Sequence, residues 1–189
     1  MLFLDISCNR DVLIKLRTKN MLAERKEQFQ THPVLCRYMA SLIPNGSITV
    51  LEPTKGEGNL VKELRRSYNV TAPNDFFQMK KKKFDCIVMN PPFSIQYTYG
   101  LPNELNKKGF QVGYYILKTC MEMSNNIIAL LPWFILTNSE NRMKEIVGWG
   151  LKSVCIVPRR WFPGSRASCC ILTLKKGYFG KIQLTTFIM

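Results

Sequence analysis

The sequence has little of the chemistry that metal sites and hydrolytic triads need. It holds one histidine, His32, and seven cysteines without a CxxC spacing, so a zinc site is not favoured. Two of the cysteines, Cys169 and Cys170, are adjacent, which is poor geometry for a disulfide. A Ser-His-Asp or Cys-His mechanism would have to use His32, and nothing near it suggests one. We therefore expect no metal, and buried cysteine thiols.

Long apolar runs are also missing. No stretch approaches the roughly 20 residues that cross a bilayer. The apolar start Met1-Leu2-Phe3-Leu4 is too short for a signal peptide and is followed at once by Asp5. No internal repeat or low-complexity tract is visible. We expect a cytoplasmic protein that has no membrane partner.

Acidic residues are few. There are 13 of them against 27 lysines and arginines, so the formal net charge of the 189-residue chain is +14. Such an excess argues for a polyanionic partner, most simply nucleic acid, although a merely basic soluble protein is the alternative. With 46% hydrophobic residues, the length suits one α/β domain with its own core. We expect an N-terminal helical extension over residues 1–29 and one domain over 30–189.

The most informative stretch runs from Phe84 to Ser94. Its apolar run, Cys86 to Met89, predicts a buried strand. That strand must end at Asn90, because Pro91 and Pro92 cannot donate to a sheet and restrict the residues before them. Ligands of open α/β sheets bind at this end of the strands. An amide, a proline-fixed carbonyl and the Phe93 ring suit a planar group that bears an NH₂, although a plain strand-terminating turn is the alternative.

A second informative stretch combines a strand, a glycine turn and a helix. The strand is predicted over 47–51, the helix over 61–67, and Glu52-Pro53-Thr54-Lys55-Gly56-Glu57-Gly58 lies between them. This order is typical of the opening of a nucleotide-binding unit. Of the two glycines, we expect one to adopt positive φ and the other to let the backbone approach a ligand. The helix start offers N–H groups to a carboxylate.

The other elements follow from apolar spacing and turn residues. Thr31 is the expected N-cap of a helix that has Pro33 in its first turn. Further helices are predicted over 110–124 and 139–147, and strands over 69–72, 126–131, 151–157, 169–175 and within 180–187. Between Tyr68 and Lys83 there is no room for a strand together with a crossover helix of at least ~10 residues, so one βα unit looks deleted.

At this point the sequence resembles a known family. Asn90-Pro91-Pro92-Phe93 after an apolar strand is similar to the catalytic loop of S-adenosylmethionine (SAM) dependent methyltransferases that act on the N6 amino group of adenine. Glu52-Pro53-x-x-Gly56-x-Gly58 resembles their SAM-binding motif. The resemblance implies that these four loop residues are catalytic, that Glu52 lies near the amino group of the methionine part of SAM, and that Asn90 also meets the cofactor.

The resemblance extends to three shorter segments. Thr31 with the following helix is similar to the segment that meets the methionine carboxylate of SAM. Asp75-Phe76 resembles the motif in which an acid meets the adenine amino group of the cofactor and the ring packs on that adenine; a turn acid and a core ring are the alternative. Phe162, with Trp161 as second candidate, resembles the late loop that contacts the extruded substrate base; a hydrophobic plug under the hairpin is the alternative. An acid for the ribose at the tip of the second strand has no counterpart. Lys80-Lys81-Lys82-Lys83 is a candidate phosphate contact or a solvated loop.

The order of these motifs is that of the gamma class. It implies a Rossmann-like SAM-dependent methyltransferase fold of α/β class, with a mostly parallel sheet, a C-terminal antiparallel hairpin and one βα unit fewer. It also implies methyl transfer to adenine N6, in DNA rather than RNA. DNA members usually carry a target-recognition domain after the hairpin, which has no place before Met189. A specificity subunit or partner protein would supply recognition; low specificity and recognition of the substrate by shape are the alternatives. The alternatives are an RNA adenine methyltransferase, a protein-glutamine methyltransferase and a catalytically weak nucleic-acid-binding relative.

Overall fold

The computed structural model describes residues 30–93, 112–162 and 168–188, and the predicted extension over 1–29 lies outside them. One sheet of seven strands runs through this part of the chain. The strands are β1 (Thr49–Leu51), β2 (Asn69–Thr71), β3 (Cys86–Met89), β4 (Asn126–Pro132), β5 (Leu151–Val157), β6 (Cys169–Lys175) and β7 (Gln183–Thr186). The helices are α2 (Pro33–Ser41), α3 (Asn59–Leu64), α4 (Val112–Met121), α5 (Phe134–Thr137), α6 (Glu140–Gly150) and the 3₁₀ turn η3 (Arg159–Trp161).

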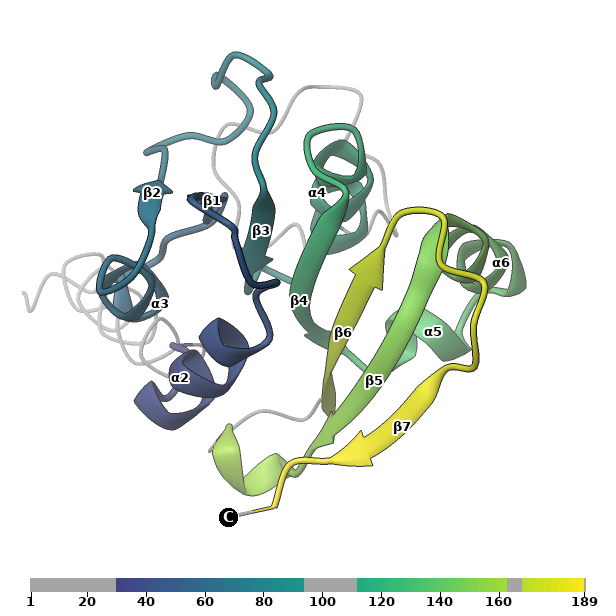
Figure 1. Cartoon of the computed structure of the whole chain (residues 1–189). Coiled ribbons are helices and arrows are strands. Elements are labelled where there is room, and N and C mark those ends of the chain that lie inside the picture. Colours follow the sequence, from purple (N-terminus) through teal and green to yellow (C-terminus); the bar gives the residue numbers. More distant parts are fainter. Residues whose placement is uncertain (1–29, 94–111, 163–167, 189) are drawn as a thin grey trace, which may run out of the picture.

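The strands lie in the order β2-β1-β3-β4-β6-β5-β7 (Figure 1). Strands β1 to β4 pair in parallel. Strand β6 is antiparallel to both β4 and β5, and β7 pairs in parallel with β5 at the edge. The predicted α/β fold, with a mostly parallel sheet and a C-terminal antiparallel β5–β6 pair, is therefore confirmed.

Helices cover both faces of the sheet, and each face has its own core. In β3, Ile87 and Met89 point into the core beneath α4 and α6, whereas Cys86 and Val88 point into the core beneath α2 and α3. Burial on both faces explains why the central strands are continuous apolar runs rather than alternating ones. The six cysteines of the described ranges are all buried, as expected. Within those ranges, no helix is long and apolar enough to cross a membrane.

The connection between β2 and β3 is as short as the sequence indicates. The chain leaves β2 after Thr71 and reaches β3 at Cys86 through turns and extended backbone, without a helix in residues 72–85. Strand β2 pairs only with β1 and forms one edge of the sheet. Within the described residues, no crossover helix therefore lies beside β2.

Several helix boundaries differ from the prediction, and those of α2 and α6 have a clear structural reason. The N-cap of α2 is His32, whose Nδ1 accepts a hydrogen bond from the Val34 amide at 3.3 Å, and Thr31 lies one residue outside the helix. Helix α6 does not end at Val147 but continues to Gly150. Gly150 has φ +135°, and a Cβ there would meet the Lys175 carbonyl, so close packing against the end of β6 fixes this end.

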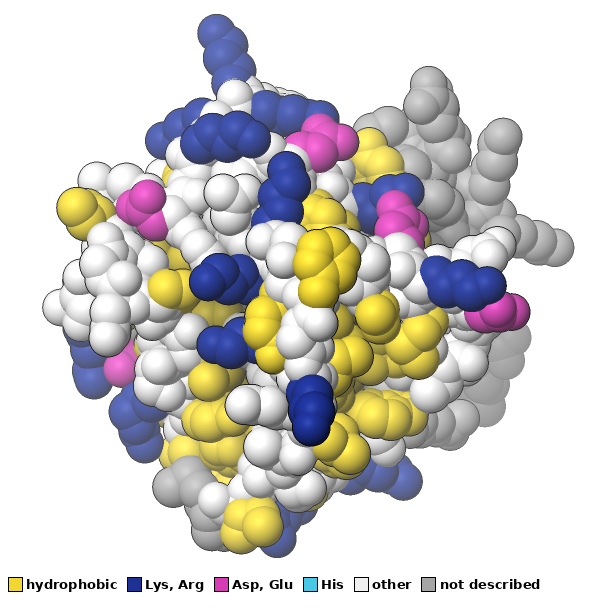
Figure 2. Space-filling model, turned by 45° about the vertical axis from the view of Figure 1, so that its right-hand side comes forward, with side chains coloured by type: hydrophobic (Ala, Val, Ile, Leu, Met, Phe, Trp, Pro, Cys, Tyr) yellow, Lys and Arg dark blue, Asp and Glu magenta, His cyan; other side chains and the backbone are white. Residues whose placement is uncertain are grey.

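The opposite edge of the sheet exposes apolar side chains. All four residues of β7 are exposed, and Phe179, Leu184 and Ile188 around it are 85%, 66% and 79% exposed. Figure 2 shows hydrophobic side chains on this side of the molecule with lysines and arginines between them. The outer edge of β7 therefore presents backbone hydrogen-bonding groups together with exposed apolar side chains.

Candidate active site at the carboxyl ends of the parallel strands

Two predicted motifs meet at one edge of the sheet. Leu51, the last residue of β1, pairs with Ile87 of β3. Glu52 and Asn90 directly follow the two neighbouring parallel strands, so both lie at their carboxyl ends. The predicted SAM loop and the Asn-Pro-Pro-Phe loop are thus adjacent, as the sequence pattern requires.

A hydrogen bond joins the Asn90 loop to the start of α2. Asn90 Nδ2 donates to Thr31 Oγ1 at 2.9 Å. The Thr31 side chain is 3% exposed, and its backbone carbonyl accepts from Asn59 Nδ2 at the start of α3, at 3.4 Å. Thr31 therefore links α2, α3 and the loop after β3, although the sequence assigned it only a cap and a cofactor contact.

Glu52 has a buried carboxyl group, and only one of its two oxygens has a hydrogen-bond partner among the described residues. It is 1% exposed, and its Oε1 accepts from the Thr54 amide at 2.9 Å and the Thr54 hydroxyl at 3.1 Å. Its Oε2 is buried and has no hydrogen-bond partner among the described residues. Burial raises the pKa of Glu52 to about 7, against the smaller lowering effects of Thr54 and Lys55. Such an oxygen needs a donor or a cation to compensate its burial.

The turn after Glu52 has the backbone that its glycines allow. Gly56 has φ +51° and Gly58, the N-cap of α3, has φ +92°. Both glycines therefore adopt the left-handed conformation, which other residues rarely adopt. A Cβ at Gly56 would also lie 3.2 Å from the Gln30 side chain, whereas Gly58 faces open space.

Asp75 and Phe76 lie in the connection between β2 and β3. Asp75 is half-buried, and its Oδ1 accepts from the Phe77 amide at 2.9 Å. The Phe76 ring is 8% exposed and packs in the core with Leu51 and Met89. In this arrangement Asp75 shapes a turn and Phe76 is a core residue. Their contact with cofactor adenine stays a prediction.

The loop after Asn90 is seated against α4. Pro91 is buried, and Pro92 and Phe93 are half-buried. A Cβ on Gly113 of α4 would lie 3.1 Å from the Pro92 carbonyl oxygen. Sequence reasoning missed Gly113, and the one available signal was a glycine within the apolar pattern of the predicted helix.

The two aromatic candidates for the substrate base lie near the start of α2. Phe162 is 4% exposed and belongs to the core beneath α2 and α3. Trp161 packs edge-on against His32, with ring centroids 5.0 Å apart, and against Phe187 at 5.2 Å. Trp161 is half-buried and Phe162 is in the core, so Trp161 is the more accessible of the two.

These residues fit SAM at one point in particular. The unpartnered Oε2 of Glu52 is suited to the ammonium group of the methionine part. Pro53, Gly56 and Gly58 form the turn beside it, and Asn90 lies at the next strand end. Among the described residues, no group of three or more His, Cys, Asp or Glu side chains could hold a metal.

Comparisons with known proteins found similar structures but no similar sequences. No family model and no curated protein matches the sequence. The fold is similar to that of a class I SAM-dependent methyltransferase from Listeria monocytogenes, with TM-score 0.63 and 15% identity over 82% of this chain and 64% of that one. It is also similar to a modification subunit of a type I restriction enzyme from Vibrio vulnificus, with TM-score 0.63 and 14% identity over 100% and 54% of the two chains.

A third neighbour acts on RNA. The 23S rRNA methyltransferase ErmE matches with TM-score 0.54 and 16% identity over 78% of this chain and 69% of that one. The chain spans less than two thirds of the first two neighbours. At these identities the likeness concerns the fold, which agrees with the strand order and the two-sided helix layers. The chain therefore has the Rossmann-like fold of SAM-dependent methyltransferases.

Proposed function

We propose that the protein is a SAM-dependent methyltransferase that acts on the N6 amino group of adenine in DNA. The observation that carries this proposal is the meeting, at one sheet edge, of the Asn90-Pro91-Pro92-Phe93 loop with the buried, unpartnered oxygen of Glu52. One element suits an aromatic amine and the other suits the cationic end of the cofactor. The neighbouring modification subunit, named for a restriction enzyme, supports DNA as the substrate.

In the mechanism, the protein's residues prepare the amino group. A base inside a duplex must be extruded before its amino group can be reached. The Asn90 side-chain oxygen and the Pro91 carbonyl accept its two N–H groups, and Phe93 stacks on the ring. These hydrogen bonds favour tetrahedral nitrogen, whose lone pair is then available for attack. They are strongest in the transition state, as catalysis requires. When bound, SAM supplies the methyl group.

Thr31 has a positioning role in this mechanism. Because its Oγ1 accepts from Asn90 Nδ2, the amide turns its nitrogen, and not its oxygen, toward Thr31. The Thr31 hydroxyl still has its own proton to donate. The predicted contact with the methionine carboxylate is therefore compatible with the observed hydrogen bond.

RNA is the second candidate substrate. The supporting observation is the likeness to an rRNA methyltransferase. A specificity subunit or other partner protein remains part of the proposal for the DNA enzyme, since such subunits accompany type I modification subunits. Protein-glutamine transfer receives no support from the positive charge of the chain.

Two measurements test the proposal. Calorimetric titration of SAM should give saturable binding that is lost in Glu52→Gln and weakened in Asp75→Ala. Transfer of a labelled methyl group to matched DNA and RNA oligonucleotides should require adenine and should be abolished in Asn90→Ala. Turnover that persists in Asn90→Ala would refute the mechanism, and an absence of SAM binding at millimolar concentration would refute the activity.

A further inference from the structure

The face formed by α2 and α3 carries exposed cations that form no salt bridge with another described residue. Arg37 on α2, Lys62 on α3 and Arg65, the C-cap of α3, are all exposed. The salt bridges within the described ranges use Arg66, Lys81, Lys118 and Lys144 instead. The two helices pack against each other, so the three charges lie on one continuous surface, which we call the α2–α3 face.

One end of this face is a hollow beside the open edge of the sheet. It has a volume of about 560 Å³ and lies between α3 and Ala72, the first residue after β2. The residues that line it are Lys55, Gly56, Glu57, Gly58, Val61, Lys62, Arg65 and Ala72. Three cations thus surround a single acid, Glu57. Among the described residues, no crossover helix covers this hollow.

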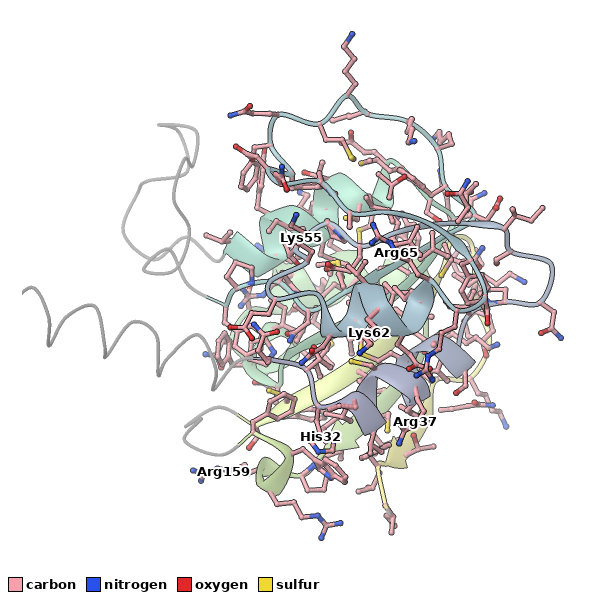
Figure 3. The ribbon with its side chains drawn as sticks, turned by 90° about the vertical axis from the view of Figure 1, so that its left-hand side faces the viewer. His32, Arg37, Lys55, Lys62, Arg65 and Arg159 are labelled. Carbon is pink, nitrogen blue, oxygen red and sulfur yellow. The ribbon has the colours of Figure 1, made fainter. Side chains whose placement is uncertain are left out.

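The other end of the face reaches the candidate active site. His32, at the start of α2, packs on Trp161 of η3, and the preceding residue, Thr31, holds Asn90. Figure 3 shows Lys55, Arg65, Lys62 and Arg37 following one another across α3 and α2, with His32 and Arg159 beyond them. The cations therefore lie between the hollow, which includes Gly56 and Gly58 of the predicted SAM loop, and the start of α2 beside Asn90.

The acids on this face do not cancel its charge. Glu63 of α3 pairs with Arg66 at 3.2 Å, which leaves Glu57 against Arg37, Lys55, Lys62 and Arg65. The Lys55 ammonium donates to the Asn74 side-chain oxygen, a neutral group that leaves its charge in place. The face keeps a surplus of positive charge.

The lysine run Lys80–Lys83 is a weaker candidate for phosphate contacts. It precedes β3 and therefore lies at the amino ends of the parallel strands, opposite Asn90 (Figure 1). Lys81 pairs with Glu122 at 2.6 Å, and Lys83 donates to the Glu122 carbonyl at 2.7 Å. Lys82 lies over the Phe84 ring at 5.0 Å. Three of these four lysines already have local partners.

We propose that the α2–α3 face binds the phosphodiester backbone of the substrate nucleic acid and leads the strand to Asn90. The inference rests on the proposed function and adds the surface that holds the substrate. Exposed arginine and lysine side chains bind phosphates by charge and release counterions, and the arginine fork can bind one phosphate through two hydrogen bonds. Such contacts position the strand without reading its sequence.

The test compares two triple variants with the same net charge. Arg37→Glu, Lys62→Glu and Arg65→Glu together change the α2–α3 face. Lys80→Glu, Lys152→Glu and Lys176→Glu, all exposed positions elsewhere, form the control. Each set replaces three positive charges by three negative ones, so the formal net charge falls by 6, from +14 to +8. Binding of one single-stranded oligonucleotide, as DNA and as RNA, is measured by fluorescence anisotropy at several salt concentrations.

We expect the face variant to bind at least ~10-fold more weakly than the control variant. Three lost phosphate contacts should also reduce the slope of log K against log salt by about 2. Both variants should retain SAM affinity, because none of the substituted residues is assigned to the cofactor. Equal weakening of the two variants, or no weakening of either, would overturn the proposal.

Two controls separate this proposal from the proposed function. Wild-type protein that binds nucleic acid through this face but not SAM would refute the methyltransferase activity and leave the face in place. Wild-type protein that binds SAM but no nucleic acid would refute the face. If circular dichroism shows that the glutamate variant is unfolded, Arg37→Gln, Lys62→Gln and Arg65→Gln against glutamines at the control positions gives the same comparison.

Discussion

At the scale of single residues, the Thr31 hydroxyl decides which way the Asn90 amide points. The amide nitrogen donates to Thr31 Oγ1, and the 3% exposure of Thr31 leaves little room for water to replace that acceptor. Both amide orientations have similar shapes, so the acceptor on the protein selects between them. A buried hydroxyl 59 residues away in the sequence thus sets the direction of a proposed catalytic oxygen.

The first prediction concerns Thr31→Val, which keeps the shape and removes the acceptor. Loss of one hydrogen bond at this half-buried amide costs about 1 kcal/mol, so kcat for methyl transfer should fall about fivefold. Thr31→Ser retains the hydroxyl and should keep most of the activity. Steady-state kinetics of the two variants, with urea unfolding as a check of stability, measure the effect. Equal kcat values for Thr31→Val and wild type would contradict the positioning role.

Glu52 should have opposite effects on stability and on cofactor binding. Its pKa is about 7 in the folded protein against a usual value of 4.5. Below about pH 4.5 the group is protonated in both states. As pH rises toward 7 the unfolded chain releases this proton first, so stability falls with pH. The ionised form is the one that attracts an ammonium group, so SAM affinity should rise over the same interval.

The second prediction follows for Glu52→Gln. In the absence of cofactor, this variant should be more stable than wild type by on the order of 2 kcal/mol at about pH 8, with the difference vanishing near pH 4. SAM binding should be lost at both pH values. Urea unfolding and calorimetry at each pH measure the two effects. A variant that is less stable than wild type at pH 8 would show that Oε2 has a partner in the folded protein.

At the scale of elements, helix α4 sets the position of the Asn-Pro-Pro-Phe loop. Gly113 allows the Pro92 carbonyl to approach the helix, because a Cβ at this position would lie 3.1 Å from that oxygen. This contact is tighter than most Cβ contacts, so a larger residue at this position would push the loop away from the helix by a few tenths of an ångström or more. The loop is thus supported by Thr31 at one end and by α4 at the other.

The third prediction uses the two helical glycines as a matched pair. Gly113→Val should push the loop away and lower kcat by on the order of tenfold, while SAM affinity changes less. Gly148→Val on α6 is the control, since nothing lies within 4 Å of a Cβ there, and it should leave kcat unchanged. The ratio of kcat values for the two variants is the measured quantity, and a ratio near one would contradict the role of Gly113.

At the scale of the whole molecule, local patterns in the sequence predict the elements but not all of their neighbours. Apolar runs that stop at proline or glycine place β3, β5 and β6 correctly, and the short gap before Cys86 predicts the missing crossover helix. The insertion of β6 between β4 and β5 and the parallel pairing of β7 with β5 depend on long-range packing, which no local spacing encodes.

For the candidate site as well, local sequence patterns predict some residues, whereas long-range packing decides the others. Glu52, Gly56, Gly58 and Asn90 lie at the expected sheet edge, because strand ends can be located from prolines and glycines. Thr31 is not the N-cap of α2, since His32 takes that place and Thr31 is recruited by a distant loop. The core position of Phe162 was also not predictable, since an aromatic residue beside arginines suits a surface contact and a core equally.

The fourth prediction concerns the place of β6 between β4 and β5. Strand β6 is hydrogen-bonded to β4 on one side and to β5 on the other, so the amides of these three strands should exchange as one cooperative unit. Hydrogen–deuterium exchange should show the same free energy of opening for β4, β5 and β6, above that of the edge strands β2 and β7. If the amides of β5 exchange well before those of β6, the hydrogen bonds between the two strands are weaker than their register implies.

This strand order also determines when the protein can fold during synthesis. The ribosome releases β4 and β5 before β6, yet neither of them has its neighbour until Cys169–Lys175 arrives between them. Until then, β4 has one bare edge and β5 has no strand to pair with, and both are apolar runs of the kind that associate between chains. A nascent chain that pauses before residue 169 is therefore the species most in need of a chaperone.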